Sequence, residues 1–235
     1  MTSSTTSATP RSRGGFDWFA VAALLAMIAA FARAIFFTPP ERLQGYAQKI
    51  FYVHVPSAWI AFLAFGLTAF AGAYWLFLKD PRLDRFAESS AEVGVMFTTG
   101  VLVTGPLWGK PIWGIWWVWD ARLTSTLFLW FLFLGYLVLR GAVEDRDARA
   151  RYSAVVAMLG ALLIPFIHLS VYLFRTQHPM PVVANPTGVQ MPMVMVKTLL
   201  LSLAAFTLVY IALVRARMKL ATERDALLDR AGAET

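Results

Sequence analysis

The chain contains no cysteine. Disulfides, thiolate metal sites and covalent haem attachment through a C-x-x-C-H motif are therefore excluded, and any cofactor must be held by histidine, carboxylate, backbone or packing. The sequence also lacks the phosphate-binding pattern G-x-x-x-x-G-K-[ST], because Gly109-Lys110 is not part of such a pattern. We therefore predict that this chain does not hydrolyse a nucleotide by itself.

Charged residues are scarce. They make up 15% of the 235 residues, whereas hydrophobic residues make up 58%. A typical soluble domain has about 25% charged residues. Because the apolar residues form long blocks, the composition indicates an all-α, polytopic integral membrane protein. The net charge of +7 does not require a nucleic-acid partner, since Lys and Arg lie mostly in short segments between apolar runs.

Six apolar runs are each long enough to cross the ~30 Å apolar layer of a bilayer as a helix. A cleaved signal peptide is the competing interpretation of the first run, but that run continues through Phe37, past the small residues at 32–34. Barrel strands are excluded because the runs are too long for them. We place the spans at about 17–37, 53–78, 89–107, 123–139, 153–174 and 191–214.

The distribution of Lys and Arg predicts the orientation in the membrane. The N-terminal tail, the turns at 79–85 and 140–151 and the segment from Arg215 to the C-terminus hold 14 of the 21 Lys and Arg residues. The positive-inside rule then predicts that both termini are cytoplasmic. Docking of a cytoplasmic subunit is an alternative role for these Arg-rich turns. The predicted organisation is a disordered tail (1–15), a six-helix membrane domain (16–215) and a charged cytoplasmic tail (216–235) that extends the last helix into water.

The most distinctive stretch is the tryptophan segment, residues 108–120, which reads W-G-K-P-I-W-G-I-W-W-V-W-D. It contains five of the nine tryptophans in the chain. Its glycines, proline and lysine indicate neither a regular helix nor a strand, so we predict an irregular, flat aromatic surface on the outer face, within 108–125. An aromatic belt at the headgroup level is the alternative, although a belt distributes tryptophan over several helix ends.

Two of the three histidines, His54 and His178, are predicted to share the outer face with the tryptophan segment. Pro56 indicates that His54 lies at or just before a helix start. A porphyrin is flat and apolar, carries two propionate carboxylates and has an iron that accepts imidazole. These segments therefore predict a haem site, whereas two unrelated histidines in wet loops are the alternative. Candidate propionate partners are Arg42, Lys110, Arg122 and Arg175.

Two further residues each have two interpretations. Asp120 is predicted to cap the fourth helix, with its side chain bonded to N–H groups near Leu123. A role in orienting haem or in binding a partner is compatible with that cap. His168 lies inside the fifth run, either as a neutral side chain bonded to a neighbouring helix or as a second haem ligand.

Two motifs resemble those of a known family. Trp113 to Asp120 matches the pattern W-G-x-x-W-x-W-D and continues as A-R-L-T-S, and residues 52–59 read Y-V-H-V-P-S-A-W. These motifs resemble the haem exporter protein C (CcmC) family of system I cytochrome c maturation, and the resemblance covers nearly the whole chain. The larger haem lyase subunit of the same pathway shares the tryptophan pattern but has many more spans.

The resemblance implies that haem b is bound non-covalently on the periplasmic face of the bacterial inner membrane, with His54 and His178 as axial ligands. The family passes haem to a membrane-anchored chaperone (CcmE), and the ABC transporter subunits CcmA and CcmB and the small subunit CcmD complete the complex. The chain is thus expected to be a transport and assembly factor and not an enzyme. The candidate haem platform comprises Trp108, Trp113, Gly114, Trp116, Trp117, Trp119 and Asp120.

One stretch departs from the family pattern. Residues 172–179 read Y-L-F-R-T-Q-H-P, where the family has a tryptophan pair and an N-T-L-H-Q run. His168 therefore stays open as an alternative ligand. The rival function is a b-type cytochrome that transfers electrons to or from quinone, which would need paired histidines inside the membrane. A generic permease subunit would explain the spans but not the tryptophan segment.

Overall fold

The computed structural model describes residues 15–174, 176–183 and 188–233. Within these residues, six helical segments are long and apolar enough to cross a membrane, which confirms the predicted all-α, six-span architecture. A π-helical turn (Arg33–Phe37) extends the first helix, and a 3-10 turn (Tyr46–Ile50) precedes the second. The α-helices are α1 (Trp18–Ala32), α2 (Phe51–Leu78), α3 (Pro81–Trp113), α4 (Ala121–Ala142), α5 (Arg146–Ala161), α6 (Leu163–Leu173) and α7 (Met193–Ala233).

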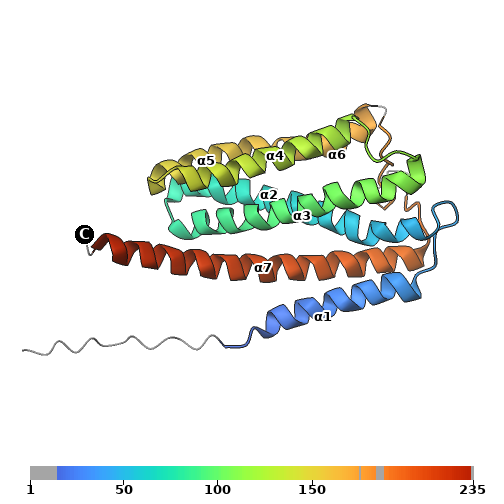
Figure 1. Ribbon diagram of the computed structural model, residues 1–235, viewed down its shortest axis with the longest axis horizontal. Coiled ribbons are helices and arrows are strands. Elements are labelled where there is room, and N and C mark those ends of the chain that lie inside the picture. Colours follow the sequence, from blue (N-terminus) through green and yellow to red (C-terminus); the bar gives the residue numbers. More distant parts are fainter. Residues whose placement is uncertain (1–14, 175, 184–187, 234–235) are drawn as a thin grey trace, which may run out of the picture.

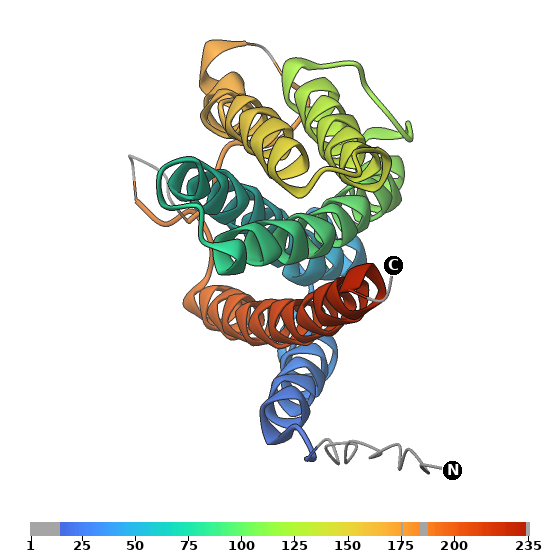
Figure 2. The same cartoon turned by 90° about the vertical axis from the view of Figure 1, so that its left-hand side faces the viewer.

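The helices form a layered bundle with α2 and α3 at its centre (Figure 1). Helices α4, α5 and α6 cover one side of this pair, α7 covers the other, and α1 lies outermost against α7 (Figure 2). The start of α1 and the end of α7 point toward the same end of the bundle, as an even number of spans requires. Which side of the membrane that end occupies stays a prediction.

Helix α3 is longer than the sequence predicted. Asp80 caps α3 by accepting a hydrogen bond from the Arg82 N–H (2.8 Å), and Pro81 fits the first helical position. The helix therefore begins inside the segment predicted as a charged turn. Helix α7 passes position 215 and continues to Ala233, because neither glycine nor proline interrupts 193–231. The charged tail is thus a helix wherever it is described, which confirms the predicted helical extension.

The fifth span is divided into α5 and α6. Pro165 lies in the first turn of α6, and its ring nitrogen cannot donate the hydrogen bond that a continuous helix would give to the Ala161 carbonyl. Leu162 separates the two helices. The missing hydrogen bond therefore explains why α5 ends there, although no loop follows it before α6.

Small residues allow the central helices to approach closely. A Cβ atom added at Gly94 of α3 would lie 2.6 Å from Cε1 of Phe65 and 3.1 Å from Cβ of Ala64, both on α2. The Phe65 ring stacks on Phe133 of α4, with centroids 3.7 Å apart. Close approach through small residues is typical of helices in membranes, where packing rather than water exclusion drives association.

Buried polar side chains also bond across helices. The Ser90 hydroxyl of α3 donates to the Ala64 carbonyl of α2 (2.8 Å) and lies 2.8 Å from the Tyr210 hydroxyl of α7. One serine therefore joins three helices. In an apolar layer such bonds each contribute about 1 kcal/mol.

Charged residues join α3, α4 and α7 at the end of the bundle where α7 terminates. Arg140 forms a bidentate pair with Asp84 (2.7 and 2.9 Å) and also contacts Glu88 (3.1 Å). Arg224 of α7 forms a second bidentate pair with Glu88 (2.8 and 2.9 Å). We call these four residues the ion cluster. Arg140, expected as a topology signal or a docking residue, is thus a buried structural residue whose side chain is 3% exposed.

We predict that Arg140→Met destabilises the protein far more than Arg217→Met. Removing Arg140 leaves two carboxylates with a lost partner, at a cost of about 3–5 kcal/mol for a buried pair. Arg217 also pairs with a carboxylate of α3, Glu92, but its side chain is 45% exposed, and such pairs contribute about 0–1 kcal/mol. Thermal unfolding of the detergent-solubilised protein measures both. Equal melting temperatures for the two variants would contradict the structural role of Arg140.

Candidate haem site

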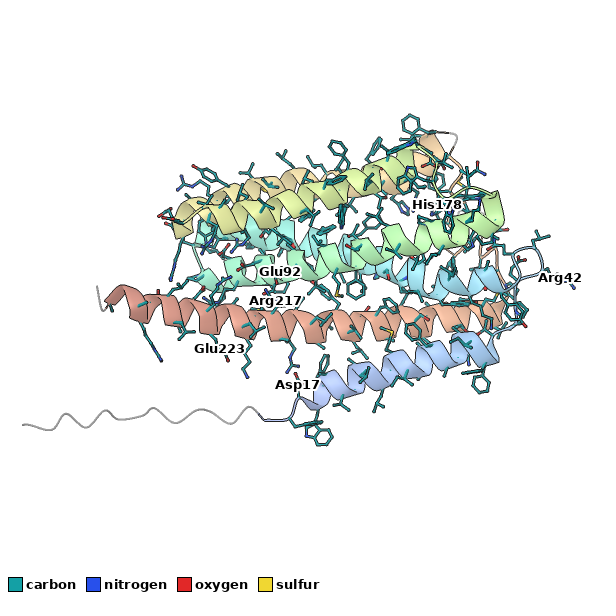
Figure 3. All side chains as sticks on the ribbon, viewed as in Figure 1. Asp17, Arg42, Glu92, His178, Arg217 and Glu223 are labelled. Carbon is teal, nitrogen blue, oxygen red and sulfur yellow. The ribbon has the colours of Figure 1, made fainter. Side chains whose placement is uncertain are left out.

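The imidazole rings of His54 and His178 lie next to each other, with centroids 6.4 Å apart and planes inclined by 33°. Figure 3 shows His178 at the end of the bundle opposite the end of α7. The expectation that His54 lies at a helix start is wrong in detail, because the 3-10 turn runs directly into α2 and places His54 and Pro56 within the helix. His178 lies in the loop between α6 and α7.

Hydrogen bonds fix the tautomer of both rings. The Thr104 hydroxyl of α3 donates its only hydrogen to the Gly100 carbonyl (2.7 Å), so it accepts a hydrogen bond from Nδ1–H of His54, 2.9 Å away. Nδ1 of His178 lies 2.9 Å from the Pro179 carbonyl oxygen, which can only accept. Both neutral rings therefore carry their proton on Nδ1 and leave the Nε2 lone pair available to a metal.

The spacing of the rings fits two imidazoles on opposite sides of one metal ion. A coordinating nitrogen lies about 2.0–2.1 Å from a metal, so two such rings have centroids roughly 6 Å apart. Among the described residues, no cluster of three or more His, Asp or Glu side chains could hold a metal. A metal between these two histidines would therefore need its other ligands from a group such as a porphyrin.

Arg122 at the start of α4 supplies positive charge beside the histidines. Burial and the Arg122 guanidinium lower the pKa of His178 to about 4, although the Pro179 carbonyl and Asp120 raise it. His178 is therefore neutral near pH 7, as a ligand must be. The Nη1 atom of Arg122 and the Nε1 atom of Trp117 are both buried, and neither has a hydrogen-bond partner in the described part of the chain. Buried donors without partners are costly, and propionate oxygens are suitable acceptors.

The tryptophan segment is half helical, which corrects the prediction of an irregular stretch. Helix α3 continues through Trp113, so that Lys110 and Pro111 are helical, and Gly114 ends the helix with a φ of 77° that favours glycine. The Lys110 ammonium donates to the Gly114 carbonyl (2.8 Å) and lies 5.9 Å from the Trp116 ring. Lys110 thus stabilises the end of α3, and within the tryptophan segment only residues 114–120 are irregular.

The tryptophan rings do not form one flat surface. Trp108 and Trp113 pack edge to face with centroids 4.9 Å apart, and Trp117 and Trp119 do so at 5.6 Å. The Trp108 Nε1–H donates to Gln44 in the loop before α2 (3.0 Å), which anchors one pair to the rest of the protein. A planar ligand would therefore meet ring edges as well as ring faces.

Asp120 uses both carboxylate oxygens. Oδ1 accepts from the Leu123 N–H (2.8 Å), which confirms the predicted cap of α4. Oδ2 accepts from the Gln177 N–H (3.0 Å), a bond that the sequence did not predict. One side chain therefore joins the tryptophan segment, the start of α4 and the residue before His178.

The remaining candidates lie elsewhere or cannot be placed. Figure 3 shows Arg42 at the tip of the loop between α1 and α2, away from His178. Arg175 lies outside the described residues. His168 is exposed on α6, with its nearest aromatic ring, Tyr172, at 6.4 Å, and it is not part of the histidine pair. Arg122 is therefore the predicted cation that lies beside the histidines.

Sequence reasoning missed two residues that shape the position of His54. Thr104 holds Nδ1, and Gly105 lies against the ring, since a Cβ there would be in van der Waals contact with His54 Cε1 at 3.4 Å. Both belong to α3, fifty residues from His54 in sequence. A threonine and a glycine in an apolar helix give no local signal of a histidine neighbour.

Comparison with known proteins identifies similar sequences. The family model described as heme exporter protein C matches residues 3–230. The heme exporter protein C of Bradyrhizobium diazoefficiens is 36% identical over 203 residues, which cover 86% of this chain and 76% of the relative. That of Escherichia coli K12 is 37% identical over 164 residues, which cover 68% and 66%.

A relative of organellar type is equally similar. A putative cytochrome c biosynthesis ccmC-like mitochondrial protein of Marchantia polymorpha is 37% identical over 164 residues, which cover 70% of this chain and 67% of the relative. The match to the family model spans nearly the whole chain, including both histidines and the tryptophan segment. This chain therefore belongs to the heme exporter protein C family.

Proposed function

We propose that this chain binds haem b non-covalently, with His54 and His178 as axial ligands, and presents it to the chaperone CcmE on the periplasmic face of the inner membrane. CcmA, CcmB and CcmD are the proposed partners in the complex. The observation that carries the proposal is the histidine pair, whose Nδ1 atoms are both engaged and whose centroids are 6.4 Å apart. Relatives named heme exporter protein C support a role in haem export and cytochrome c maturation.

The chain's own residues have distinct proposed tasks. Bound haem supplies an iron with two open axial positions. His54 and His178 fill these positions as neutral ligands, and Arg122 offers its unpaired N–H to a propionate. The edge-to-face tryptophans would offer apolar ring edges and faces to the porphyrin. No covalent step is needed, which is consistent with a transport and assembly factor rather than an enzyme.

The two ligands are held with unequal rigidity. His54 is built into α2 and bonded to α3, whereas His178 lies in a loop whose described contact with the tryptophan segment runs through Asp120. Local opening of a loop costs less than opening packed helices. We infer that haem is released by withdrawal of His178 while His54 keeps its place. This arrangement suits a protein that must pass its cofactor on.

The rival function, a b-type cytochrome, is not favoured. Such a protein holds haem between histidines buried at mid-membrane depth. His168 is exposed, and the paired histidines lie at the end of the bundle. Electron transfer to quinone therefore has no histidine pair at mid-membrane depth to support it among the described residues.

We predict that His54→Ala and His178→Ala each replace the absorption spectrum of six-coordinate haem with that of five-coordinate haem in the detergent-purified protein. His168→Ala is the matched control and is expected to keep the wild-type spectrum, because its side chain is remote from the pair. Haem-dependent co-purification of CcmE is expected to fall with the first two variants and not with the third. A spectrum sensitive only to His168→Ala would refute the assignment.

Thr104→Val is predicted to weaken haem binding by about 10–100-fold, as loss of a hydrogen bond to a ligating histidine typically does. Valine keeps the shape of threonine but cannot hold Nδ1 of His54. Thr98→Val is the control, because Thr98 also bonds the carbonyl four residues earlier but does not touch His54. Equal haem affinity of the two variants would mean that the hydrogen bond between Thr104 and His54 does not support haem binding.

Asp120→Asn separates the two roles of Asp120. Asparagine is as good a helix cap as aspartate, but its amide nitrogen cannot accept the Gln177 N–H. We therefore predict a melting temperature close to that of the wild type and a haem dissociation rate raised about tenfold, measured by transfer to apomyoglobin. Asp145→Asn, which alters a cap of α5 only, is expected to leave the rate unchanged. An unchanged rate in Asp120→Asn would limit Asp120 to capping.

A further inference from the structure

A groove lies where α1 begins and α7 continues past it. The Arg215 guanidinium of α7 lies 4.9 Å from the Phe19 ring of α1, so this level of α7 is beside the first turn of α1. The groove has a volume of about 400 Å³ and is open to the surface. Figure 3 shows Asp17 at the start of α1 and Glu223 on the adjoining stretch of α7. Its lining residues are Asp17, Arg215, Ala216, Lys219, Leu220 and Glu223.

The four charged side chains that line the groove have no ion-pair partner within the described chain. The Arg215 guanidinium lies over the Phe19 ring, and Oδ1 of Asp17 caps α1 by accepting from Phe19 and Ala20 (3.0 and 3.2 Å), whereas Oδ2 accepts no bond from the described residues. The opposite face of α7 differs, because its charged residues pair with α3. Within the described chain, the groove therefore presents two cations and two carboxylates that form no ion pair.

The groove lies at the border between the apolar span and water. Residues 193–214 of α7 carry a single charged residue, Lys197, and the charged part of the helix starts at Arg215. Phe16 and Trp18, both exposed, pack edge to face at the same end of α1, with centroids 4.7 Å apart. Aromatic residues of this kind mark the headgroup level of a bilayer. Lipid headgroups are therefore the molecules that this groove faces.

We propose that the groove binds the headgroup of a phosphatidylethanolamine. Arg215 and Lys219 bind the phosphate by charge-assisted hydrogen bonds. Glu223 and Oδ2 of Asp17 accept hydrogen bonds from the primary ammonium, which has three N–H donors. A phosphatidylcholine headgroup has the same phosphate but no N–H, and a phosphatidylglycerol headgroup brings no cation to the carboxylates. The pairing of charges therefore selects one headgroup class.

Native mass spectrometry of the detergent-purified full chain tests this proposal with the three lipids carrying identical acyl chains. Phosphatidylethanolamine is expected to bind at least about tenfold more tightly than either other lipid. Glu223→Gln is expected to remove the preference over phosphatidylglycerol. Arg215→Gln with Lys219→Gln is expected to lower the binding of all three lipids. All three substituted side chains are exposed, so the melting temperature is expected to stay unchanged.

The control removes two other exposed cations at the same end of the bundle, by Arg151→Gln with Arg230→Gln, and is expected to leave lipid binding unchanged. Equal binding of phosphatidylethanolamine and phosphatidylcholine would overturn the proposal. A control that lowers binding as much as the groove variant would also overturn it, because attraction would then be unspecific. Soluble phosphorylethanolamine that binds as tightly as the lipid would overturn the assignment to a membrane lipid.

Discussion

Polar groups among membrane helices must find hydrogen-bond partners inside the protein, because lipid offers none. This constraint explains why Ser90 of α3 bonds to Tyr210 of α7, and why Arg140 of α4 lies between two carboxylates of α3. It also governs His54, whose Nδ1 is held by Thr104. Each such contact fixes the rotation of one helix against another. The bundle is therefore ordered by a few polar contacts as much as by its apolar surface.

The two ends of the bundle meet this constraint in different ways. At the end with the ion cluster, the buried charges pair with one another, and the resulting contacts join α3, α4 and α7. At the other end, Arg122 has a buried N–H without a partner in the described part of the chain, beside two histidines whose Nδ1 atoms make the hydrogen bonds. Arg140 Nε is likewise buried without a partner among the described residues, but the charges of the ion cluster are paired with one another, which suits a structural role. The arginine at the other end forms no ion pair with a carboxylate of the described residues and lies beside two imidazoles, which suits the binding of an external group.

Asp120 connects the local and the long-range parts of this site. Its position before an apolar run was enough to predict the cap at Leu123. Its second oxygen holds Gln177, which precedes His178 and is far away in sequence. Likewise, the glycines and proline of the tryptophan segment suggested irregular backbone, yet α3 absorbs Pro111 and ends only at Gly114, because neighbouring contacts stabilise the helix end.

The sequence alone determined the six spans, the all-α class and the cap of α4, because these depend on apolar runs and on residues a few positions apart. It also identified His54, His178 and Arg122 as candidates, through residue type and resemblance. Only the tertiary structure brought the two imidazoles to 6.4 Å, oriented their Nδ1 atoms and separated Arg42 and His168 from them. Those outcomes depend on how α2, α3 and the loop after α6 pack together, and no pattern along the chain encodes the distance between side chains of different helices.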